Sequence, residues 1–306
     1  MARTSRQRII LHIGTPKTGT SYVQRGLFDN RAQLSQQGIC VPLSGADPYA
    51  LETDEPVIVH NQLAWAIAES RPISGFSRNE IIESWPKIIA EIRSSRCHTA
   101  IITSEVFYWE MDTLDQIEQI KSQLAEFDVF VWVYWRDPAE FCESMYLQAV
   151  KDWDYSDSLG EFIAENIERF MLLRRLKKWG RVFGTKSMLI RYYDPLLRVK
   201  TFGDYMKPLS VTGINEPFPV TFSQNKSLPE GFLEVFKALS INGLQEAKEQ
   251  LRSSIWLVDR AREKILSVGE RALIHAFLSP HYPAIPEPDR HSALPQKAHP
   301  ENNGDQ

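Results

Sequence analysis

Two glycines and a lysine near the start of the chain have the types and the spacing of a phosphate-binding loop. In ILHIGTPKTGTSYVQ (10–24), Gly14 and Gly19 are five residues apart. In an ATP-binding loop, G-x-x-x-x-G-K-[ST], the lysine follows the second glycine; here Thr20 holds that position and Lys17 lies inside the loop. Backbone N–H groups at the start of a helix bind anions. Because no Ser/Thr and Asp pair for Mg²⁺ is evident, the pattern predicts a metal-free site for a 5′-phosphate ester.

A second group of candidate residues follows the most apolar segment of the chain, VFVWVYW (129–135). Arg136 comes directly after this segment, and Ser144 lies eight residues further on. An arginine at the carboxyl end of a strand offers a charged fork to a phosphate monoester, and a serine on the next helix adds a hydroxyl. The ordinary alternatives are that Arg136 pairs with Asp137 or a neighbouring helix and that Ser144 is a helix surface residue.

Together the two stretches resemble the sulfotransferases that use 3′-phosphoadenosine 5′-phosphosulfate (PAPS). GTPKTGTSYVQ (14–24) is similar to their 5′-phosphosulfate loop, and RDPAEFCESMYLQAV (136–150) has the arginine-to-serine spacing with which the family holds the 3′-phosphate. The resemblance covers 8–34 and 101–150. It implies that Lys17 stabilises the leaving group and that the donor is bound by Thr15, Pro16, Lys17, Thr18, Gly19, Thr20, Ser21, Arg136 and Ser144.

Glu105 is the candidate for the base that takes the proton of the acceptor. It follows a β-rich run in IITSEVFYW (101–109), and ligands of open parallel sheets bind beyond the carboxyl ends of the strands. A glutamate there resembles the catalytic carboxylate of glycan-modifying sulfotransferases, whereas the phenol and steroid branch uses a histidine. The resemblance therefore implies a carbohydrate or glycoconjugate acceptor with a reactive hydroxyl or amine. The alternative is that Glu105 caps the next segment or pairs with Lys17 or Arg136.

Three further residues are weaker candidates. His60 stands at the start of a predicted helix and could contact the acceptor or act as the base, although a surface or capping role is the ordinary alternative. His12 lies within the first predicted strand and is expected to be a hydrogen-bonded interior residue. Lys226 lies in a late loop with which family members often close over the nucleotide; a helix-capping turn is the alternative.

The elements that position these residues follow from the hydrophobic pattern. Short apolar runs predict strands, and segments with helical spacing alternate with them. The unbroken apolar run before Arg136 predicts a central strand that is buried on both faces. The alternation predicts a three-layer α/β fold with an open, mostly parallel sheet of four to five strands, and the resemblance implies the P-loop-like sulfotransferase fold. The expected strands are 8–13, 38–42, 99–103, 128–135 and 187–194; the expected helices include 21–30, 60–70, 79–94, 114–127, 159–179 and one opened by Pro138; 43–55 is expected to be loop.

Composition limits the other possibilities. The 306 residues have a net charge of −4, which predicts no general attraction to nucleic acid. Three separated cysteines predict neither a disulfide framework nor a metal site, and no apolar run approaches the ~20 residues of a membrane-spanning helix. We expect a cytoplasmic protein with one domain over 1–283 and a polar, proline-rich tail over 284–306. The rival functions are a P-loop kinase or nucleotide-binding protein with a divergent loop and a non-catalytic binding protein.

Overall fold

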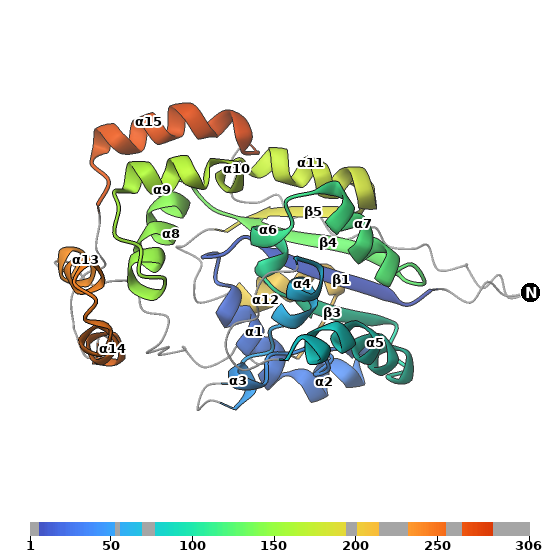
Figure 1. Ribbon diagram of the computed structural model, residues 1–306. Coiled ribbons are helices and arrows are strands. Elements are labelled where there is room, and N and C mark those ends of the chain that lie inside the picture. Colours follow the sequence, from blue (N-terminus) through green and yellow to red (C-terminus); the bar gives the residue numbers. More distant parts are fainter. Residues whose placement is uncertain are drawn as a thin grey trace, which may run out of the picture.

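The computed structural model describes residues 6–52, 56–68, 77–193, 201–213, 232–254 and 265–283, and over these ranges it contains one parallel β-sheet (Figure 1). The strand order is β2-β3-β1-β4-β5, and every neighbouring pair is parallel. This confirms the predicted α/β fold and all five expected strands. Their bounds are β1 (Arg8–Gly14), β2 (Ile39–Cys40), β3 (Thr99–Thr103), β4 (Asp128–Trp135) and β5 (Met188–Tyr192).

Helices cover both faces of the sheet, which gives the predicted three layers (Figure 1). In the part of the chain that the structure describes, their bounds are α1 (Thr20–Asp29), α2 (Arg31–Gln36), α3 (Pro48–Leu51), α4 (Asn61–Ala68), α5 (Arg78–Ser94), α6 (Val106–Glu110), α7 (Leu114–Gln123), α8 (Pro138–Asp152), α9 (Leu159–Glu165), α10 (Ile167–Phe170), α11 (Leu172–Phe183), α12 (Thr201–Met206), α13 (Leu233–Ile241), α14 (Gln245–Ser254) and α15 (Val268–Leu278).

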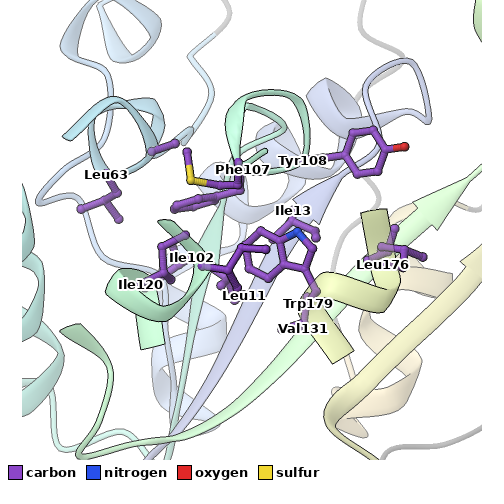
Figure 2. Close-up of a cluster of buried hydrophobic side chains, with 14 of the residues drawn as sticks. Leu11, Ile13, Leu63, Ile102, Phe107, Tyr108, Ile120, Val131, Leu176 and Trp179 are labelled. Carbon is purple, nitrogen blue, oxygen red and sulfur yellow. The ribbon is translucent and has the colours of Figure 1, made fainter. Parts of the chain in front are cut away.

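Strand β1 divides the interior into two cores because successive side chains of a strand point to opposite faces. Leu11 and Ile13 join the core formed with α4, α6, α7 and α11, whereas Ile10 joins the core formed with α1 and α12. Figure 2 shows the first of these cores, where Leu11 and Ile13 lie near Phe107 of α6 and Trp179 of α11. Both cores anchor β1, so the loop that follows it starts from a fixed strand end.

Two expected elements differ from the structure. The predicted helix over 159–179 is divided into α9, α10 and α11. Asn166 lies at the first break, where its side chain donates to the carbonyl of Phe162 and accepts from Arg169, and Arg169 also bonds the carbonyl of Trp109. The segment expected to be loop over 43–55 contains the short helix α3, which begins at Pro48 and is capped by Asp47.

The basic residues of α11 differ in their exposure. Among Arg174, Arg175, Lys177 and Lys178, Arg175 is 3% exposed. Its guanidinium binds Asp112 and the carbonyls of Tyr108 and Met111. Arg175 therefore ties α11 to the end of α6, while Arg174 and Lys177 are exposed. None of the helices that the structure describes is long and apolar enough to cross a membrane.

Candidate functional site

The phosphate-loop candidate lies between β1 and α1, at the carboxyl edge of the sheet. Both the backbone N–H and the hydroxyl of Thr15 donate to the carbonyl of Tyr134, at 2.7 and 3.0 Å. The Thr18 hydroxyl donates to the carbonyl of Thr15 at 2.7 Å. Gly19 holds the N-cap position of α1 without a side-chain cap. The loop is therefore tied to β4 on one side and leads directly into a helix N-terminus, where partial positive charge attracts anions.

Three residues in and beside the loop have positive φ angles, which turn the backbone sharply. Gly14 has φ 93°, Lys17 φ 65° and Gly19 φ 77°. Glycine adopts such values readily, but a lysine in this region carries backbone strain of about 1 kcal/mol or more, a feature that clusters at functional sites. A Cβ at Gly19 would lie 2.9 Å from the ring of Tyr193. These backbone angles turn the chain at Lys17, between the two glycines. A side chain larger than that of glycine at position 19 would collide with Tyr193.

Glu105 lies against the start of this loop. It follows β3 and holds the N-cap position of α6, and a Cβ at Gly14 would be 3.3 Å from its Cα, Cβ and Cγ. The Thr20 hydroxyl donates to Oε1, and Gln24 Nε2 donates to Oε2 at 3.1 Å. Two donors from α1 therefore fix the Glu105 carboxylate beside the loop. Gln24 was not anticipated from the sequence, although its spacing of four residues from Thr20 puts both on one helix face.

Arg136 and Ser144 meet each other and the loop. Arg136 follows β4 and is 6% exposed, and its Nη1 donates to the Lys17 carbonyl at 2.9 Å and to Ser144 Oγ at 3.3 Å. Ser144 is 7% exposed, so the alternative of a surface serine is wrong. Asp137 instead caps α8 by accepting from the backbone N–H of Glu140 and pairs with His275. Arg136 forms an ion pair with Glu140 of α8, so the alternative that it pairs with a neighbouring helix is confirmed, although the sequence did not single out Glu140.

The two histidines are interior residues. His60 has 0% exposure; its Nδ1 accepts from the N–H of Thr103 at 3.1 Å, and its Nε2 lies 3.0 Å from the carbonyl of Pro42. His12 is also buried, with Nδ1 2.9 Å from the Thr103 hydroxyl, as expected. The predictions that His60 contacts the acceptor or stands on the surface do not fit an enclosed side chain. It instead fixes the end of β3, just before Glu105.

Burial of these histidines predicts a stability that depends on pH. Desolvation lowers the pKa of His60 to about 4 and that of His12 to about 3, from an ordinary 6.5. Below pH 6.5 the unfolded chain therefore binds protons that the folded chain excludes, and the free energy of unfolding falls as the pH is lowered towards 4. Each histidine contributes a slope approaching about 1.4 kcal/mol per pH unit.

Urea unfolding at pH 7, 6 and 5 measures this slope. In His60→Gln the amide can replace both hydrogen bonds without titrating, so we expect its slope to be smaller than that of the wild type. His98→Gln, at an exposed position, is the matched control. If the free energy of unfolding of His60→Gln changed with pH as steeply as that of the wild type, His60 would not be a source of the pH dependence.

Lys226 is the remaining candidate from the sequence, and it lies outside the described residues. The aromatic residues Trp65, Phe107 and Tyr108 are buried in the core and are not exposed for stacking on a ligand. Among the residues that the structure describes, no group of three or more His, Cys, Asp or Glu side chains could hold a metal ion.

Comparisons with known proteins give a partial likeness to solved structures. No family model matches the sequence, and no curated protein matches it. Among solved structures, the crystal structure of a sulfotransferase from Alicyclobacillus acidocaldarius is similar to this chain. The two are 15% identical with a TM-score of 0.43, and the match covers 80% of this chain and 96% of the other. A likeness of this degree decides neither the family nor the activity.

Proposed function

We propose that the protein transfers a sulfuryl group from PAPS to a hydroxyl or amine of an acceptor. The observation that carries the proposal is that three separate segments converge at one sheet edge. Glu105 after β3 contacts Gly14 and Thr20, and Arg136 after β4 bonds the Lys17 carbonyl, so both contact the loop after β1 and its flanking residues. Carboxyl ends of parallel strands are where ligands bind in such sheets.

The donor has two anionic ends, and the site offers two adjoining anion-binding features. The loop residues Thr15–Ser21 and the N-terminus of α1 would bind the 5′-phosphosulfate. Arg136 and Ser144 would bind the 3′-phosphate. Support for the second assignment comes from Arg136 Nε, which is buried and has no hydrogen-bond partner among the described residues. Arg175 and Arg191 also have a buried Nε without a partner among the described residues. Arg136 is the one of these three whose guanidinium bonds the loop, so its Nε would be available there to a ligand oxygen.

The chemistry needs positioning and charge stabilisation more than covalent work by the protein. The acceptor oxygen or nitrogen forms a bond to sulfur while the bond from sulfur to the 5′-phosphate oxygen breaks. Lys17 would stabilise the negative charge that grows on that departing oxygen. Glu105 would take the acceptor proton, since a carboxylate has about four acceptor positions and the bonds from Thr20 and Gln24 occupy two of them.

The acceptor class follows from the identity of the base. The resemblance to glycan-modifying enzymes rests on a glutamate at the end of β3, and Glu105 stands there. Both histidines near β3 are enclosed, which leaves Glu105 as the better placed base. We therefore propose a carbohydrate or glycoconjugate acceptor and no metal.

Calorimetry with 3′-phosphoadenosine 5′-phosphate (PAP), the desulfated product, tests the proposal. In EDTA we expect sub-millimolar binding that is lost in Arg136→Ala and retained in Arg181→Ala, a control at an exposed arginine of α11. Losing one partner of a buried charge pair weakens binding by about 2–5 kcal/mol. A preference for Mg·ATP would support the rival P-loop kinase and reject the proposal. Binding of PAP without transfer of labelled sulfate to any acceptor would support the non-catalytic alternative.

A further inference from the structure

The guanidinium of Arg136 is already partly neutralised inside the protein. Its Nη2 forms an ion pair with the carboxylate of Glu140, four residues further along the chain. Its Nη1 donates hydrogen bonds to the Lys17 carbonyl and to Ser144 Oγ. The Arg136 side chain is 6% exposed and that of Glu140 is 35% exposed. The positive member of the pair is therefore enclosed, and the negative member reaches towards solvent.

The donor atoms of Arg136 are only partly used. A guanidinium has five N–H donors in a fixed planar fork. Two on Nη1 are directed at the Lys17 carbonyl and Ser144, one on Nη2 is directed at Glu140, and Nε is buried without a partner among the described residues. Nε and Nη2 therefore still offer donors to a further oxygen, and any anion that uses them comes close to the Glu140 carboxylate.

We propose that Glu140 is an internal counter-ion that competes with the 3′-phosphate of the nucleotide for Arg136. This role rests on the proposed function. A buried charge without a partner is costly, so Glu140 stabilises the ligand-free state. When a phosphate binds at Arg136 and Ser144, the carboxylate becomes a like charge beside it and a rival for Nη2. The consequence is weaker binding of nucleotides that carry a 3′-phosphate, which favours release of PAP after each turnover.

The two neighbouring acidic residues, Asp137 and Glu143, bind other groups than Arg136. Asp137 caps α8 and pairs with His275. Glu143 is 3% exposed and accepts from the backbone N–H groups of Ile265 and Leu266 and from Arg271. Of these three carboxylates on the segment that carries Ser144, Glu140 is the one that bonds Arg136. The effect should therefore be specific to Glu140 and to the 3′-phosphate.

The competing role of Glu140 is tested by measuring the affinity of two nucleotides by calorimetry and their release rates by stopped-flow. PAP carries the 3′-phosphate and adenosine 5′-phosphate lacks it, so the ratio of their affinities isolates the Arg136 end of the site. In Glu140→Gln we expect PAP to bind roughly tenfold tighter and to leave more slowly, an ordinary size for coupling between two sites. Binding of adenosine 5′-phosphate should stay within about twofold. Glu118→Gln, at an exposed position on α7, controls for the change in net charge.

Glu140→Ala provides a second variant in which no side-chain amide can replace the carboxylate. If neither variant binds PAP more tightly than the wild type does, the competing role is overturned. Weaker PAP binding in both would show that Glu140 orients Arg136 for the phosphate, which also overturns it. The proposed function fails separately, and this role with it, if the wild-type protein binds PAP no better than adenosine 5′-phosphate.

Discussion

Replacing Lys17 by alanine is expected to lower kcat by about 10²- to 10³-fold, the usual loss when one group that stabilises transition-state charge is removed. Lys17 lies at the tip of the loop, between Gly14 and Gly19, where its backbone is held at φ 65°. The ammonium would meet the charge on the departing phosphate oxygen, which is larger in the transition state than in the bound donor. Binding of PAP should fall much less than kcat.

The Lys17→Ala result depends on an intact fold. Alanine keeps a Cβ at the strained position, so the loop has no new backbone freedom and the unfolding transition should change little. Lys186→Ala is the matched control. Lys186 is exposed and lies just before the amino end of β5, whereas the proposed site lies at the carboxyl edge of the sheet. Lys17→Arg, which keeps the charge, should recover part of the rate. Turnover near the wild-type level in Lys17→Ala would exclude the proposed role.

Glu105→Gln is expected to reduce sulfuryl transfer by about 10²- to 10⁴-fold and to leave nucleotide affinity nearly unchanged. The amide has the shape of the carboxylate but cannot accept the acceptor's proton. Its oxygen can still accept from the Thr20 hydroxyl, and Gln24 can turn its own amide to face the new N–H group. The variant therefore removes the base while preserving the contacts between α1 and α6.

Parallel measurement of labelled sulfate transfer and PAP calorimetry separates the two effects. Glu110→Gln makes the same change five residues further along, at the end of α6, and should retain activity. A Glu105→Gln protein that transfers sulfate at the wild-type rate would remove Glu105 from the mechanism. A protein that loses PAP binding together with transfer would show that Glu105 supports the loop instead of acting as a base.

The sheet was predictable because its strands are short runs of mostly apolar residues. β1 and β3 are buried along almost their whole length, and β4 follows the same pattern over its carboxyl half. Their parallel order brings the residues after each strand to one edge, so the meeting of the loop, Glu105 and Arg136 also followed from the sequence. The roles of these residues remain predictions.

Long-range contacts set the features that the sequence did not reveal. His60 is enclosed because its ring bonds Pro42 and Thr103, 18 and 43 residues away. The break in the 159–179 helix involves the bond between Arg169 and the Trp109 carbonyl, 60 residues apart. Arg136 and Glu140 have the spacing of a helix ion pair, but spacing alone does not show that the arginine is buried. Local patterns predict elements, whereas these contacts depend on how distant elements pack.

The crystal structure of the protein bound to PAP tests the central claim most directly. The account predicts the 5′-phosphate within hydrogen-bond distance of the loop Thr15–Ser21, with the 3′-phosphate on Arg136 and Ser144. The Glu105 carboxylate should face the position that the sulfuryl group would occupy. A 3′-phosphate bound away from Arg136, with the arginine still engaged only with Lys17, Ser144 and Glu140, would contradict it.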